Sequence, residues 1–203
     1  FFGTAQDHKK VGEGDVGKNT GGMGAYSPAP ILSKELEEKI KNKIINPTLK
    51  AMKNLNHPYK GFLYAGLMIK KNEPYLIEYN IRMGDPECQA IMMRLKNDLI
   101  EIVDKTTQNK INDLKIEWTN KNSITIVLCS KGYPDNYIKD SEIKNLSSIL
   151  MDENNQIFHA GTYEENNKIY SSGGRVLNIT SSSESLKEAR NKSLMNIDKI
   201  NWP

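Results

Sequence analysis

The sequence is poor in the residues that mark several common protein classes. It holds two cysteines, Cys88 and Cys129, and their spacing is not that of a metal site. Two reduced thiols in a cytoplasmic protein are therefore favoured over a disulfide scaffold or a zinc module. No apolar run approaches the ~20 residues that span a bilayer, so we expect no membrane partner. The net charge of +3 is spread along the chain without a basic block, which gives no indication of nucleic acid.

The rest of the composition is that of an ordinary globular protein. Charged residues make up 26% and hydrophobic residues 37% of the 203 residues, enough for one domain with a sizeable core or for two small domains. The chain has no initiator Met and opens on the apolar stretch FFGT, so we expect it to be part of a longer protein.

Glycine and polar residues dominate residues 1–30, which we predict to form a functional loop. Successive backbone N–H groups within it would surround an anion, because glycine permits the positive φ angles that such a nest needs. The residues concerned are Asn19, Gly21, Gly22, Met23 and Gly24. The alternative interpretation is a flexible connection. Upstream stand Asp7, His8 and Lys9, either a polar cluster that holds a charged substrate or an exposed run of charge.

Apolar periodicity next predicts a helix and a hairpin. Ser33 is a candidate N-cap, apolar residues follow it at helical spacing, and a kink is expected at Pro47. Strands are predicted over 62–69 and 75–81, joined by the polar segment KKNEP. The odd positions of the second strand are apolar, and we expect that face to be packed; they are Tyr75, Ile77, Tyr79 and Ile81.

The opposite face of the second strand carries Glu78, Asn80 and Arg82, since alternate side chains share a face. Carboxylate and amide oxygens are hard ligands suited to Mg²⁺, which keeps water and substrate phosphates as its other ligands. A guanidinium on the same face can pair with a phosphoryl oxygen or a carboxylate. The alternative is a solvated strand face with one salt bridge. The following GDPE favours a site, because Asp85 and Glu87 add carboxylates, with Asp85 a plausible helix N-cap.

After the GDPE turn, apolar residues at helical spacing predict one helix that ends at about residue 104. A polar stretch over 105–122 then suggests a domain boundary. Beyond it, strands are predicted in SITIVLC (123–129), QIFHAGTY and IYSSGGRVLNIT, and a last helix from about Ser183. In SSGGRV, Arg175 stands beside a glycine pair, which is either a second anion-binding feature or a β-bulge or hairpin turn.

In their order along the chain, these segments resemble the phosphoribosylamine–glycine ligase family of the ATP-grasp superfamily, also called glycinamide ribonucleotide synthetases. The resemblance covers nearly the whole chain, and its most specific part is the RxGDPExQ pattern. It is carried by AQDHKKVGEGDVGKNTGGMGAYSP, GFLYAGLMI, IEYNIRMGDPECQAI, LCSKGYP, FHAGT and SSGGRV.

The resemblance implies an α+β fold in two parts. Residues 1–104 would be the later part of an ATP-grasp core, an antiparallel sheet with helices, and residues 105–203 a small α/β C-terminal domain that closes over the active site. The N-terminal half of the enzyme, with the lysine-bearing lobe that clamps the nucleotide, would be missing.

The same resemblance implies roles for the candidate residues. Glu78 and Asn80 would bind Mg²⁺ or Mn²⁺, and Arg82 would be the catalytic cation that steadies the transferring phosphoryl group. The substrate-binding set would be Asp7, His8, Lys9, Asn19, Gly21, Gly22, Met23, Gly24, Asp85, Glu87 and Arg175. Met83 stands where Phe or Leu is usual in the family, a conservative apolar change. FLYAGLMI lacks the acidic ligand that many ATP-grasp enzymes carry on this strand, which leaves a second metal site open.

The implied reaction uses ATP to join glycine to 5-phosphoribosylamine through a glycyl phosphate. Two alternatives stay open from the sequence. One is an ATP-grasp ligase for another acid and amine, and the other is a non-catalytic module that binds Mg²⁺ or phosphate weakly or assembles with a partner chain.

Overall fold

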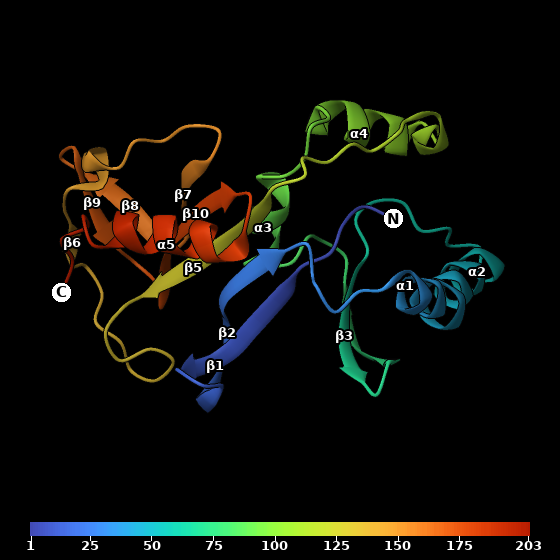
Figure 1. The fold of residues 1–203 in the computed structure, drawn as a ribbon, viewed down its shortest axis with the longest axis horizontal. Coiled ribbons are helices and arrows are strands. Elements are labelled where there is room, and N and C mark those ends of the chain that lie inside the picture. The colour runs from blue at the N-terminus through green and yellow to red at the C-terminus, as the bar shows by residue number, and fades with distance from the viewer. The chain divides into compact units, whose positions relative to one another are not determined.

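A computed structural model describes residues 1–203 and divides them into two compact units that interleave along the chain. The first unit comprises residues 1–28, 85–95 and 118–203, and the second comprises residues 29–84 and 96–117. Every strand pair in both units is antiparallel, and helices accompany the sheets, which confirms the α+β class (Figure 1). The predicted division after residue 104 stays a prediction.

A five-stranded sheet forms the first unit, in the order β1-β2-β5-β10-β7. The strands are β1 (Gln6–Gly12), β2 (Val16–Ser27), β5 (Asn122–Cys129), β10 (Arg175–Ser183) and β7 (Asn155–His159). The prediction of a loop over residues 1–30 was therefore wrong for most of that range. Glycine and polar residues hide the strand signal, whereas pairing of β2 with the apolar strand β5 sets its conformation, with Gly24 opposite Ile126.

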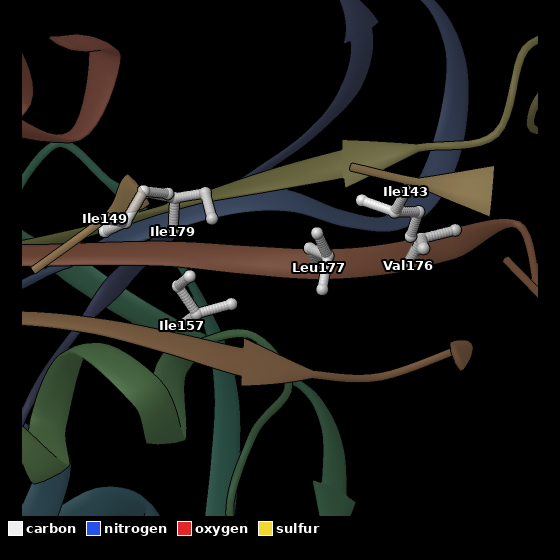
Figure 2. Close-up of a cluster of buried hydrophobic side chains, with 6 residues drawn as sticks. All are labelled: Ile143, Ile149, Ile157, Val176, Leu177 and Ile179. Carbon is white, nitrogen blue, oxygen red and sulfur yellow. The ribbon is translucent and has the colours of Figure 1, made fainter. Parts of the chain in front are cut away.

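The core of this unit is a cluster of buried aliphatic side chains, drawn in Figure 2: Ile143, Ile149, Ile157, Val176, Leu177 and Ile179. A small sheet adds β6 (Glu142–Ile143), β9 (Lys168–Ser171) and β8 (Thr162–Glu165). Helix α5 (Leu186–Ile197) packs on β5 and β10. We predicted that this helix begins near Ser183, but Ser183 ends β10, and Ser185 is the N-cap, with Oγ accepting from the Glu188 N–H at 3.2 Å.

The single helix expected up to residue 104 is two separate helices. Helix α3 (Glu87–Met92) ends early, and α4 (Leu99–Thr107) begins anew at Asp98, whose Oδ1 accepts the Ile100 N–H at 2.7 Å. Periodicity alone did not reveal this break, because apolar spacing continues across it, while the capping carboxylate starts a new helix. Asp85 was also wrong as an N-cap, since α3 begins at Glu87 without a side-chain cap.

In the second unit, α1 (Lys34–Ile40) and α2 (Asn46–Asn54) form one helical segment. Ser33 is confirmed as its N-cap, with Oγ accepting the Leu36 N–H at 3.1 Å. Between the helices the backbone widens into a π-helical turn over Lys41–Ile45. That irregularity lies immediately before Pro47, which has no N–H to give to the helical ladder.

The predicted hairpin is present as β3 (Tyr64–Lys70) and β4 (Glu73–Asn80). Lys71 and Asn72 connect the strands with φ angles of 52° and 59°, as a two-residue turn between twisted strands requires. The expected packing of the apolar face was wrong for three of its four residues: Tyr75, Ile77 and Ile81 are 55%, 64% and 81% exposed, whereas Tyr79 is half-buried and its hydroxyl lies 2.7 Å from Thr48 Oγ1. The pairing of β3 with β4 shifts register between Gly66 and Leu67 and skips Ile77, which interrupts the expected alternation. No helix in either unit has the length and apolarity needed to cross a bilayer.

Candidate functional site

The end of β4 carries the candidate metal-binding pair in the second unit. Glu78 and Asn80 share a face, and Asn80 Nδ2 donates to Glu78 Oε1 over 3.3 Å. Opposite them, Gly66 pairs with Glu78, and a Cβ added at Gly66 would lie 3.1 Å from Glu78 Cγ. The missing side chain at Gly66 therefore leaves room for the Glu78 side chain on the surface of the hairpin.

Arg82 follows the strand end and is exposed. Its Nη1 donates to the Met83 carbonyl oxygen over 2.8 Å, and no carboxylate lies within ion-pair distance of its guanidinium. The single salt bridge of the alternative interpretation is thus absent. A cation at a strand end without an acidic partner is suited to an anionic ligand.

Glu78 and Asn80 fit a hard divalent cation. Glu78 is exposed and has no cationic partner in the chain, and rotation of the Asn80 amide would offer an oxygen in place of its nitrogen. No three His, Cys, Asp or Glu side chains gather into a metal cluster. Two oxygen donors are too few for a dedicated cage, but they suit Mg²⁺ or Mn²⁺ that also binds water and nucleotide phosphates.

A second group of candidate residues meets at Arg175 in the first unit. Its Nη2 donates to Asp85 Oδ2 over 2.8 Å, and its Nη1 donates to the Asp85 and Gly21 carbonyl oxygens over 3.1 Å and 3.0 Å. The Gly22 carbonyl oxygen lies 3.5 Å from the same nitrogen. Asp85 Oδ1 accepts from Gln89 Nε2 over 3.2 Å, so both carboxylate oxygens have protein partners.

The glycine pair of β2 donates its N–H groups to protein oxygens. Gly21 N–H donates to the Tyr133 hydroxyl and Gly22 N–H to Thr20 Oγ1, each over 3.0 Å. Thr20 Oγ1 in turn donates to the Lys9 carbonyl oxygen over 2.8 Å. A role for this segment toward an anion stays a prediction. Sequence reasoning missed Tyr133, because its partner lies 112 residues away in the chain.

Asp7, His8 and Lys9 do not converge on one point, because neighbours along β1 alternate between faces. Asp7 and Lys9 form an ion pair of 3.3 Å. On the other face, the His8 ring lies 5.6 Å from the ring of Tyr26. His8, Gly24 and Tyr26 contribute to the lining of an open cavity of about 350 Å³ over β1, β2 and β5.

Three further candidates lie on β2 and at the start of α3. Asn19 is exposed on β2, and Glu87 is 4% exposed at the start of α3. The sulfur of Met23 lies 3.8 Å from Cys129 Sγ. Burial raises the pKa of the Cys129 thiol to about 11, against the opposing charge of Arg175, so this thiol is protonated at neutral pH and a weak nucleophile.

Seven of the candidate residues thus form two groups, one in each unit. In the second unit, Glu78 and Asn80 touch each other, and Arg82 follows two residues later. In the first unit, Arg175 brings together Asp85, Gly21 and Gly22. The group in the second unit offers oxygen ligands and a cation, while the group in the first unit is held by contacts within the protein.

Comparison with known proteins gives two family models that match most of the chain. The ATP-grasp (A) domain of phosphoribosylglycinamide synthetase matches residues 1–88, and the C domain of the same synthetase matches residues 123–203. A phosphoribosylamine–glycine ligase of Mesorhizobium japonicum is 46% identical over 100% of this chain and 47% of the relative. One of Vigna unguiculata is 44% identical over 98% of this chain and 66% of the relative.

Among solved structures, a phosphoribosylamine–glycine ligase from Thermotoga maritima superposes with a TM-score of 0.82 and 32% identity. The match covers 98% of this chain and 48% of the Thermotoga chain. The present chain therefore spans about half the length of several relatives that it matches.

Proposed function

The chain belongs to the phosphoribosylglycinamide synthetase family, and from this premise we propose that it supplies part of an ATP-dependent ligase for glycine and 5-phosphoribosylamine. The product would be glycinamide ribonucleotide, an intermediate of purine biosynthesis. The observation that carries the proposal is the end of β4, where an exposed carboxylate and a half-buried amide are followed by a guanidinium without an acidic partner and by the GDPE turn.

The proposed reaction has two steps. A carboxylate oxygen of glycine attacks the γ-phosphorus of ATP, the bond from that phosphorus to the ADP oxygen breaks, and glycyl phosphate forms. The amine of phosphoribosylamine then attacks the glycyl carbonyl carbon, phosphate leaves with the former carboxylate oxygen, and the nitrogen loses a proton. Neither step needs a covalent bond to the protein, so positioning and charge stabilisation account for the catalysis.

Glu78 and Asn80 would hold the divalent cation of the nucleotide. When bound, Mg²⁺ or Mn²⁺ would neutralise charge on the phosphate oxygens. Arg82 would pair with the transferring phosphoryl group, where a guanidinium fork matches the geometry of phosphate oxygens. The remaining part of the nucleotide site is expected in the other half of the parent enzyme, since this chain spans about half the length of several relatives.

We infer the identity of the substrates from the family relationship together with the residues of the first unit. Asp7, Lys9 and Asn19 offer charged and polar groups to the ribose phosphate or to glycine. Closure of the C-terminal part would keep water away from the glycyl phosphate. A reducing compartment such as the cytoplasm suits the thiol Cys129, which forms no disulfide.

The test is a rate measurement with radiolabelled glycine in the full-length enzyme. We expect label in glycinamide ribonucleotide only when ATP, a divalent cation and phosphoribosylamine are all present. Equal incorporation with another amine would refute the proposed substrate and favour a different ATP-grasp ligase.

The 203-residue chain should be assayed in parallel, with and without the other half of the enzyme. We expect no turnover from the chain alone and recovery when the missing half is added. Turnover by the chain alone would contradict the proposal that it supplies only part of the site. A chain that never contributes to turnover would favour the non-catalytic module.

A further inference from the structure

Three motifs that lie far apart in the sequence meet at one side chain of the first unit. The guanidinium of Arg175 contacts Gly21 and Gly22 of the glycine-rich strand and Asp85 of the GDPE turn. We call this group, with Pro86, the Arg175 clasp. Its side chains are only partly exposed, 22% for Arg175 and 45% for Asp85.

The glycine pair is shaped for this contact. A Cβ added at Gly21 would lie 2.9 Å from Arg175 Cζ, and one at Gly22 would lie 2.6 Å from Pro86 Cδ. Gly22 also has a φ angle of +122°, which L side chains rarely adopt. Because Gly21 and Gly22 have no side chains, the guanidinium and the proline ring can approach the strand closely. This close approach explains the two glycines without an anion bound to them.

The contact also depends on the fork geometry of arginine. One nitrogen of Arg175 reaches carbonyl oxygens of Gly21 and Asp85, and the other reaches the Asp85 carboxylate. A planar guanidinium can donate to several oxygens in fixed directions, whereas a lysine ammonium is a single point charge on a flexible stem. Lysine at this position would keep the charge but not the simultaneous bonds to two segments.

We propose that Arg175 is a positioning residue of the ligase, acting through Asp85, Gly21 and Gly22 rather than by binding a substrate. It fixes the turn that begins three residues after Arg82 against strand β2. An anionic substrate at this guanidinium would have to displace the Asp85 carboxylate at 2.8 Å. This inference rests on the proposed function for its kinetic test, but not for its structural test.

The structural test is hydrogen exchange on the 203-residue chain, because it needs no activity. We expect Arg175→Ala to speed amide exchange in residues 20–24 and 85–89 and to leave residues 64–80 unchanged. Lys187→Ala, an exposed charge removal on α5, is the control and should change neither segment. Unchanged exchange over residues 20–24 in Arg175→Ala would overturn the clasp.

If Arg175→Ala speeds exchange throughout the first unit, Arg175→Lys decides. Faster exchange confined to residues 20–24 and 85–89 in the lysine variant supports the clasp, and no local change overturns it. Because this readout is independent of turnover, it separates a failed clasp from a failed assignment of the reaction.

The kinetic test uses a double-mutant cycle in the full-length enzyme, with Arg175→Ala, Asp85→Asn and the pair. We expect each single variant to lower kcat by about 10- to 100-fold, with each substrate KM changed by less than about 3-fold. The double variant should be no less active than the less active single variant, because Arg175→Ala already removes the side-chain contact that Asp85→Asn weakens. A large rise in one KM with kcat retained, or multiplied effects, would instead show that Arg175 binds substrate directly.

Discussion

Strands β10 and β4 show how differently the two units hold their candidate residues. After Arg175, every residue of β10 is buried, and the strand pairs with β5 on one edge and β7 on the other. In β4 no residue is buried, and its one neighbour is β3. A two-stranded hairpin is marginally stable by itself in water, whereas a multi-stranded sheet with a covered face supports itself.

The two regions carry different kinds of candidate residues. The clasp residues rest on the well-packed sheet, while the candidate metal ligands and Arg82 lie on or just after the hairpin. The hairpin is attached to its helices through polar contacts, such as Lys39 to Glu73 at 2.9 Å and Thr48 to Tyr79 at 2.7 Å. Regions with few buried apolar contacts open most readily, so mobility should concentrate in β3 and β4.

The largest expected effect tests whether the hairpin carries the chemistry. In the full-length enzyme, Arg82→Ala should lower kcat by about 100- to 1,000-fold, because a positioned charge at the transferring group is lost. The unfolding curve should not change, since Arg82 is exposed and bonds only a local carbonyl. Lys53→Ala on α2 is the control for an exposed charge. Normal turnover of Arg82→Ala would refute the assigned role.

Paired truncations test the contrast in packing. Leu177 is fully buried in the cluster of Figure 2, and Leu177→Ala should lower the free energy of unfolding by about 2–5 kcal/mol. Ile77 is 64% exposed, and Ile77→Ala should change that free energy by less than about 0.5 kcal/mol. Urea unfolding of the 203-residue chain measures both, and equal losses would contradict the contrast.

Sequence patterns predicted the hairpin of the second unit more completely than the five-stranded sheet of the first unit. Short apolar stretches predicted the β3–β4 hairpin and strand β5, and Ser33 was identified as a cap from its local neighbours. Strand β2 was not predicted because its conformation depends on pairing with β5, which is distant in the sequence, and β1 in turn pairs with β2. The local pattern therefore sufficed where a strand is apolar, but not where glycine is held by its neighbours.

The residues of the candidate site also differ in how far a local sequence pattern could predict their positions. The alternation of Glu78 and Asn80 placed them on one face, as the structure confirms, because side-chain period along a strand is a local property. The contacts of Arg175 with Asp85 and Gly21 join residues 90 and 154 positions apart, and no local pattern encodes them. The same reason explains why the exposure of Ile77 was not foreseen.

A matched pair of caps gives a smaller effect in each unit. Ser185→Ala removes the cap of α5 and Ser33→Ala the cap of α1, and each should lower stability by about 1 kcal/mol. Hydrogen exchange should report the loss in the helix whose cap was removed. Faster exchange in both units from one variant would show that the units unfold together, which would contradict their independent stability.

The smallest effect concerns pH and the attachment of the hairpin. Hydrogen bonds from Lys43 and then Lys39 lower the pKa of Glu73 from 4.5 to about 2. The carboxylate therefore contributes stability above about pH 4.5, and this contribution is lost as the pH falls toward 2. Glu73→Gln should be slightly less stable than the native chain at neutral pH, with the difference vanishing near pH 2 and shrinking in high salt. A pH-independent difference would contradict this.

The proposed acyl-phosphate chemistry is tested most directly by turnover of glycine labelled with oxygen-18 in both carboxylate oxygens. In the full-length enzyme with ATP and phosphoribosylamine, we predict ADP and inorganic phosphate carrying one labelled oxygen for each product formed. Unlabelled phosphate, or AMP and pyrophosphate in place of ADP, would contradict it.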